Sequence, residues 1–144
     1  MLDRLSQADR IWGASSVVAL VATFLPWYRF DEGDHRVTAN AFGSGFLGDV
    51  VFVAATAAIV LLLMAHGVIA VRNTPNHRRL ALPLGAIALA AVVLQMLVGI
   101  NGSGAFHSLT IGIVVALLAT AGMTLGGLMQ RQDTGAMRHV QGRR

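Results

Sequence analysis

Few side chains in the apolar parts of this chain could do chemistry, and His66 and Gln95 are the strongest candidates. Polar groups inside a membrane are costly and are often functional. His66 is expected about five residues from the inner end of its apolar segment, roughly 8 Å deep by helix rise. An imidazole there could bind haem or quinone, or relay a proton. The simpler interpretation is that both side chains hydrogen-bond a serine, a threonine or a backbone carbonyl across a helix bundle.

Haem ligation by two histidines would need both imidazoles to face one iron. His107 is expected at the opposite end of the helices from His66, about 20 Å away by helix rise. His77 could approach His66 only if the loop that carries it folds inward. The sequence contains no Ser–His–acid set, zinc motif, phosphate-binding loop or cysteine. We therefore expect neither an enzyme nor a bound cofactor, and His66 is only a weak candidate ligand.

The composition indicates a membrane protein. Of the 144 residues, 55% are hydrophobic and 12% are charged, whereas about 25% charged residues is usual in soluble domains. We predict an all-α membrane protein, an antiparallel bundle of four transmembrane helices, because four apolar segments approach the ~20 residues that cross a bilayer. The expected spans are 11–27, 46–71, 80–100 and 109–129, preceded by a cytoplasmic segment 1–10 and followed by a loose, basic cytoplasmic tail 130–144. Asp9 is expected to cap the first helix.

The arginines predict the orientation. All eleven basic residues are arginines, and nine lie in the N-terminal segment, the 72–79 loop or the tail. Only Arg29 and Arg36 lie in the opposite loops. The positive-inside rule therefore places both termini in the cytoplasm, with the chain in the plasma membrane. The same distribution explains the net charge of +4 without nucleic acid as a partner.

The segment "FLPWYRFDEGDHRVTANAF" (24–42) leaves the membrane and returns to it. Pro26 ends the first helix, because proline lacks an N–H group. The stretches "WYRF" and "HRVTA" can pair as a hairpin around the acidic turn, and Asn40 can cap the returning helix. The acids Asp31, Glu32 and Asp34 could bind a cation only weakly.

The aromatic residues of this loop allow two interpretations. Tryptophan and tyrosine commonly form a belt at the membrane surface. Alternatively, they form an outward docking surface for a partner or lipid, made of Trp27, Tyr28, Asn40 and Phe42.

The pattern "FLPWY" followed by "NAF" resembles small four-span integral membrane proteins of actinobacterial type. The resemblance covers about the first third of the chain and the four-span layout. It implies an architecture and no particular activity.

Small residues recur at one-turn spacing in the predicted helices. Gly122 and Gly126 form a GxxxG motif, which lets helices approach closely. Such a ridge can pack inside the bundle or against another subunit, and we favour packing inside.

The predicted function is non-catalytic: an accessory, assembly or scaffold subunit of a plasma-membrane complex. Its partners would be the lipid bilayer and another membrane protein or a second copy of itself. One alternative is a small homo-oligomeric channel or transporter, with Gln95, Thr23 and Thr120 lining the path. Another is a haem- or quinone-binding redox protein that uses His66.

Overall fold

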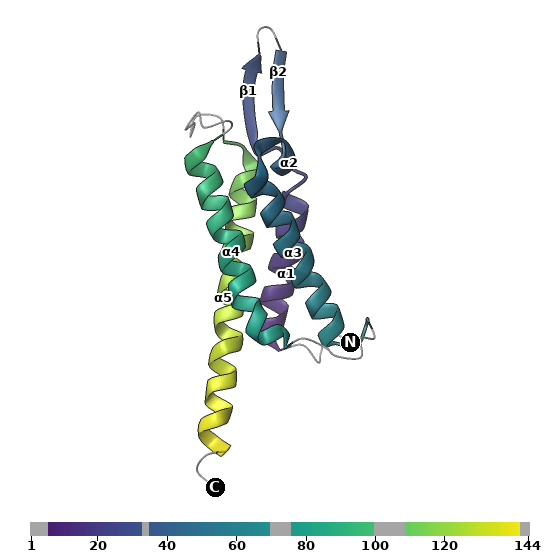
Figure 1. Cartoon of the computed structure of the whole chain (residues 1–144), viewed down its shortest axis with the longest axis vertical. Coiled ribbons are helices and arrows are strands. Elements are labelled where there is room, and N and C mark those ends of the chain that lie inside the picture. Colours follow the sequence, from purple (N-terminus) through teal and green to yellow (C-terminus); the bar gives the residue numbers. More distant parts are fainter. Residues whose placement is uncertain (1–5, 33–34, 70–75, 100–108, 142–144) are drawn as a thin grey trace.

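The computed structural model describes residues 6–32, 35–69, 76–99 and 109–141, and it is mostly helical (Figure 1). Its elements are α1 (Gln7–Ala22), β1 (Tyr28–Glu32), β2 (His35–Ala39), α2 (Ala41–Ser44), α3 (Phe46–Ala65), α4 (His77–Val98) and α5 (Ile111–Gln141). Among the described helices, α3, α4 and the first part of α5 are long and apolar enough to cross a membrane. The predicted all-α fold is confirmed, with a two-stranded hairpin added.

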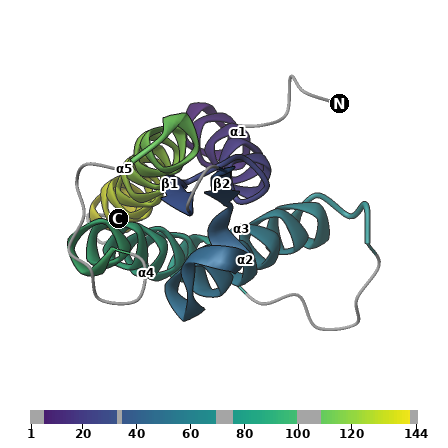
Figure 2. The ribbon, with the colours of Figure 1, turned by 90° about the horizontal axis from the view of Figure 1, so that it is seen from above.

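The four long helices pack side by side. Figure 2 shows α1, α5, α4 and α3 in that order around a common axis, and each contacts its two neighbours in this ring. Neighbouring helices run in opposite directions (Figure 1). The hairpin and α2 lie at one end, which we call the outer end. The start of α1 and the extension of α5 lie at the other, the inner end.

Glycines allow the close approach of α5 to its neighbours. A Cβ atom added to Gly126 would lie 2.8 Å from Cβ of Trp12 in α1, and one added to Gly127 would lie 2.6 Å from the backbone of Leu82 in α4. Gly122 likewise faces Ser15 of α1. The GxxxG pair therefore lies against α1 of the same chain, as expected for packing inside the bundle. Gly85 of α4 also allows a close approach to α5, because a Cβ atom added there would lie 2.7 Å from the backbone nitrogen of Thr124. This contact was not predicted from the sequence.

Two helix ends differ from the predicted spans at the inner end. α1 begins at Gln7 and is capped by Ser6, not by Asp9, because the Ser6 hydroxyl accepts the Asp9 N–H at 3.1 Å. α3 ends at Ala65 rather than residue 71, with Gly67 at φ 71° just beyond it. This left-handed conformation suits glycine and ends a helix even where the sequence stays apolar.

The end of α5 is also different. The predicted span stops at residue 129, but the helix continues to Gln141, past the other helices (Figure 1). The prediction of a loose tail from residue 130 is wrong for the residues described. Glutamine, arginine, alanine and methionine are good helix formers, so loss of hydropathy does not end the helix.

The hairpin at the outer end matches its prediction. β1 and β2 are antiparallel, with Tyr28 opposite Ala39 and Phe30 opposite Val37. Asn40 caps α2 by accepting the Gly43 N–H at 3.1 Å.

Candidate functional site

The chain offers two groups of residues that could carry function, one at each end of the helices. At the outer end, Trp27 and Tyr28 connect elements that are distant in sequence. The Trp27 indole donates to the Ala22 carbonyl at 2.7 Å, and the Tyr28 hydroxyl donates to the Gln95 carbonyl of α4 at 2.6 Å. The backbone of Trp27 also bonds Ala39 and Thr110. These bonds join the end of α1 to the hairpin, to α4 and to the start of α5.

The expected docking loop therefore needs correction. Trp27 and Tyr28 are fully buried, so neither ring is available on an outer surface. Burial removes the large apolar area of an aromatic ring from water, while the polar atom of the side chain donates a hydrogen bond to a backbone carbonyl. Burial also raises the pKa of the Tyr28 phenol above its ordinary value, because the charged phenolate would be poorly solvated.

Phe42 and Asn40, the other two residues of that loop, lie nearer the surface. Phe42 is 40% exposed and packs with Phe24 and Phe52, at centroid distances of 5.6 and 5.2 Å. We call these three rings the outer aromatic cluster. A groove of about 370 Å³ borders both Phe24 and β2, and it is lined by Phe24, Pro26, Val37, Thr38, Ala39, Asn40 and Gly43. This surface is the part of the predicted docking loop that a partner can reach.

Gln95 makes the hydrogen bonds that the simpler interpretation predicts. It is 2% exposed, and its amide donates to the Ser44 carbonyl at 3.0 Å and to the Gly99 carbonyl at 3.1 Å. The first bond joins α4 to the C-terminal end of α2. The side chain thus fastens the outer loop to the helices.

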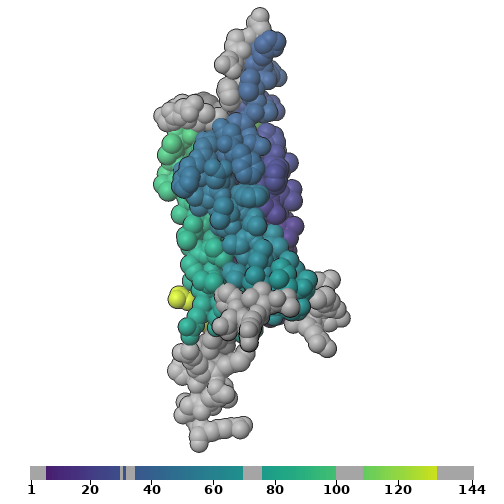
Figure 3. Space-filling view, turned by 45° about the vertical axis from the view of Figure 1, so that its right-hand side comes forward, coloured from purple at the N-terminus to yellow at the C-terminus, as the bar shows by residue number. Residues whose placement is uncertain are grey.

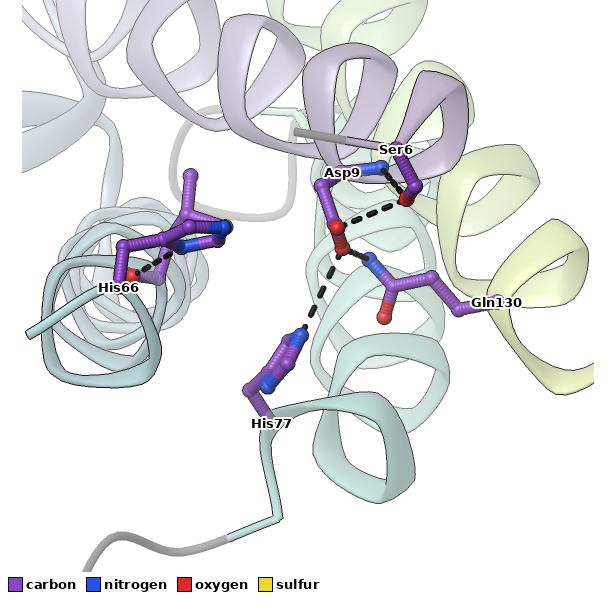
Figure 4. A network of polar contacts seen from close by, with 6 residues as sticks. Ser6, Asp9, His66, His77 and Gln130 are labelled. Atoms are coloured by element: carbon purple, nitrogen blue, oxygen red, sulfur yellow. Dashed lines mark hydrogen bonds and ion pairs between the residues drawn. The ribbon is translucent and has the colours of Figure 1, made fainter. Parts of the chain in front are cut away.

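At the inner end, a carboxylate joins three helices (Figure 4). Asp9 of α1 is 4% exposed and accepts from the Ser6 hydroxyl at 2.7 Å and from the Gln130 amide of α5 at 3.0 Å. Nε2 of His77, the first residue of α4, lies 3.5 Å from Oδ1 of Asp9. We call Ser6, Asp9, His77 and Gln130 the inner polar cluster. Because it connects α1, α4 and α5, it fixes their relative positions at this end.

The inner polar cluster contains the residue types of a hydrolytic triad in the wrong order. In such a triad the histidine lies between the serine and the acid, so that it can take the serine proton. Here Asp9 lies between Ser6 and His77 (Figure 4). His77 therefore cannot act as a base toward Ser6, and the arrangement is suited to joining helices.

His66 lies elsewhere than expected. It follows the last residue of α3 as its C-terminal cap, rather than deep inside a span, and it is half-buried. Its Nδ1 lies 2.9 Å from the Leu62 carbonyl, which can only accept, so Nδ1 carries the proton in the neutral ring. The ring centroids of His66 and His77 lie 6.3 Å apart, and His77 is the first residue of α4 rather than a loop residue. His77 Nε2 is nevertheless directed at Asp9, not at His66 (Figure 4).

The remaining candidates do not form a metal site in the part of the chain that is described. No group of three or more His, Asp or Glu side chains there could hold a metal ion. Asp31 instead lies 3.8 Å from Arg36 across the hairpin, with both side chains exposed. His107 and Asp34 lie outside the described residues.

Sequence reasoning missed Asp9 and Gln130 as partners. Asp9 was assigned to the helix cap, and Gln130 to the tail. The spacing Ser6-x-x-Asp9 is close to a capping box, and this signal could have placed Asp9 inside the helix. No local signal could have paired residues 121 positions apart.

No protein-family model, curated protein or solved structure matches this chain.

Proposed function

We propose that this chain is a non-catalytic, four-span protein of the plasma membrane, with both termini in the cytoplasm. α3, α4 and α5 are apolar enough to span, and α1 packs between α5 and α3 as the fourth helix. Hydrogen bonds from the Thr23, Phe24 and Leu25 amides continue the helical turn beyond α1. α1 and this continued turn together cover residues 7–25, which are nineteen residues. At about 1.5 Å each, they span about 28 Å, close to the ~30 Å hydrocarbon core. The arginine distribution supports the orientation.

Within this architecture, the chain acts as an accessory, assembly or scaffold subunit of a membrane complex. The observation that carries this proposal is the outer aromatic cluster beside its groove. Phe24 is 61% exposed and Phe42 is 40% exposed. The hairpin, which joins α1 to α2, rises beyond the helices (Figure 1). Exposed aromatic rings next to a groove are typical anchors of protein interfaces. Within the part of the chain that the structure describes, β2 pairs only with β1, so its other edge presents backbone groups that an extended segment of a partner could pair with.

The polar residues inside the helices support this function better than a channel. Thr23 donates to the Leu20 carbonyl at 2.6 Å, and Thr120 donates to the Ala116 carbonyl at 2.8 Å. Both are fully buried within one chain, as Gln95 nearly is. A homo-oligomeric pore would need these groups to face water along a shared path. Each of these three side chains instead donates a hydrogen bond to a backbone carbonyl of its own chain.

The test is co-purification of the tagged full chain from its own host, followed by native mass spectrometry. Phe24 and Phe42 are replaced together by alanine, and Phe46→Ala serves as the control because Phe46 is 77% exposed but lies outside the cluster. We expect a larger complex with the wild type and with the control. Loss of two interface anchors should weaken it by about thirty-fold or more.

Three results would contradict the proposal. A homo-oligomer recovered alone, with no partner, would favour the channel or transporter. A partner retained equally by the double variant would place docking away from the outer aromatic cluster. A colourless purified protein is also expected, and a haem spectrum would instead favour the redox function at His66.

A further inference from the structure

Two histidines from different helices approach each other at the inner end. His66 caps the C-terminal end of α3 and His77 is the first residue of α4, and their ring centroids lie 6.3 Å apart. Histidine is the side chain whose charge ordinarily changes between about pH 5 and pH 8. The pair can therefore gain two positive charges in that range, at a separation where like charges repel.

The contacts of each ring show which nitrogen carries the proton in the neutral form. His66 Nδ1 donates to the Leu62 carbonyl at 2.9 Å, so its Nε2 takes the additional proton. His77 Nε2 lies 3.5 Å from Oδ1 of Asp9 (Figure 4). A lone pair at this nitrogen would repel the carboxylate, so Nε2 carries the proton and Nδ1 takes the additional one. Each ring thus has one nitrogen left to titrate.

The charged and titratable groups that face His77 come from three helices, and only one of them is negative: Asp9 of α1, His66 of α3 and Arg78 of α4 itself. α5 contributes the neutral Gln130 amide, which is bound to Asp9. Asp9 favours a protonated His77, whereas Arg78 and a protonated His66 oppose it. The other described arginines at this end are exposed: Arg10, Arg79 and Arg131.

The helix ends favour the first charge on His66. The C-terminal end of a helix stabilises a cation and the N-terminal end does not, because of the helix dipole. His66 lies at the C-terminal end of α3, whereas His77 lies at the N-terminal end of α4. The His77 side chain is also only 18% exposed, and burial opposes a charge. His77 is therefore protonated second, against the charge of His66.

When both rings are charged, the end of α3 is the part that can move. The ion pair with Asp9 keeps a protonated His77, and with it α4, on α1. Residues 59–65 of α3 are only half-buried, and Figure 3 shows α3 (blue to teal) at the surface of the molecule. The turn that ends α3 is closed by the Gly67 and Val68 amides, which donate to backbone carbonyls at 3.1 and 3.0 Å.

We propose that His66 and His77 form a pH switch that loosens the end of α3 when both rings are protonated. While at least one ring is neutral, the two helix ends stay together. As the pH falls through the histidine range, the two charges repel, the last turn of α3 opens, and α4 remains on α1. The switch is a property of the chain alone, so it depends neither on a partner nor on the orientation in the membrane.

Histidine NMR of the full chain in neutral detergent tests the coupling. The His77 signal is identified by its loss in His77→Gln. In His66→Gln, we expect His77 to be protonated at a pH roughly half to two units higher than in the wild type. This shift corresponds to two unit charges 6.3 Å apart at effective dielectric constants between about 80 and about 20. His35→Gln, which removes an exposed histidine of the hairpin, is the control and should leave His77 unchanged.

Hydrogen exchange measures the loosening itself. Between about pH 7.5 and about pH 5.5, the Gly67 and Val68 amides of the wild type should lose protection about three-fold or more, after correction for the intrinsic pH dependence of exchange. His66→Gln should keep this protection at both pH values. His66→Lys restores a positive charge without the ring, so it should lose protection on acidification as the wild type does.

Three results would overturn the proposal: an unchanged His77 titration in His66→Gln, an equal loss of protection in His66→Gln and the wild type, or full protection in the acidified wild type. Thermal unfolding of each variant at about pH 7.5 separates a lost switch from a lost fold. If His66→Gln does not fold, His66→Asn makes the same test, because asparagine also suits a helix C-terminus. The assays contain no partner protein, so a failed co-purification from the host does not affect them.

Discussion

The two ends of the helices are held in different ways. At the outer end, backbone bonds of Trp27 and the Tyr28 hydroxyl join α1, the hairpin, α4 and α5, and Gln95 fastens α2. At the inner end, a single carboxylate joins α1, α4 and α5, and residues 59–65 at the end of α3 are only half-buried. The outer end is thus closed by many contacts among all elements. The inner end is closed mainly by one carboxylate that joins three helices.

The largest effect is expected from Trp27→Ala at the outer end. This change removes a fully buried indole and its bond to the Ala22 carbonyl. Replacing a buried tryptophan with alanine costs about 3–5 kcal/mol in the free energy of unfolding. Denaturant unfolding in detergent measures this cost, with Phe46→Ala as the exposed control. A change no larger than that of the control would show that Trp27 does not hold the outer end together.

A smaller effect is expected from Asp9→Ala at the inner end. The change leaves the Gln130 amide and the Ser6 hydroxyl without their shared acceptor, which costs about 2 kcal/mol in the free energy of unfolding. Hydrogen exchange should quicken at the start of α1 and of α4, but not in the hairpin. Asp31→Ala, which removes an exposed ion pair, is the control and should change little. Faster exchange at both ends would mean that the two ends are not independent.

The smallest effect concerns the pH dependence of the outer end. Burial raises the pKa of Tyr28, so its contribution to stability is complete below the ordinary tyrosine pKa of about 10 and is lost as the pH rises through the higher folded value. Tyr28 is the one tyrosine in the chain, so phenolate absorbance reports on it alone. We expect ionisation only at a pH above that of free tyrosine. Titration at the ordinary pKa would contradict the burial of this ring.

The sequence predicted features that depend on local patterns. The stretches "WYRF" and "HRVTA" on the two sides of the acidic turn predicted the hairpin, and Asn40 caps the next helix as predicted. The hydropathy of the chain predicted α3, α4 and the start of α5. Helix ends were less predictable, because Gly67 ends α3 inside an apolar run, while α5 continues through polar residues that favour helix.

The candidate site was less predictable than the fold. Trp27 and Tyr28 are residue types that commonly form a belt at the membrane surface. Only the folded structure shows that these rings are buried, with α4 next to Tyr28 and α5 next to Trp27. Asp9 resembles a capping residue, and its partner Gln130 comes from the far end of the chain. Such contacts depend on tertiary packing, which residue spacing along one helix does not encode.

Cysteine accessibility in intact cells tests the proposed membrane topology most directly. The natural chain has no cysteine, so a single introduced thiol gives an unambiguous signal. Thr38→Cys lies on the exposed hairpin and Gln132→Cys on the exposed part of α5 at the inner end. We predict that a membrane-impermeant maleimide labels Thr38→Cys in intact cells. It should label Gln132→Cys only after the cells are permeabilised. Labelling of Gln132→Cys in intact cells, with Thr38→Cys protected, would contradict the proposed orientation.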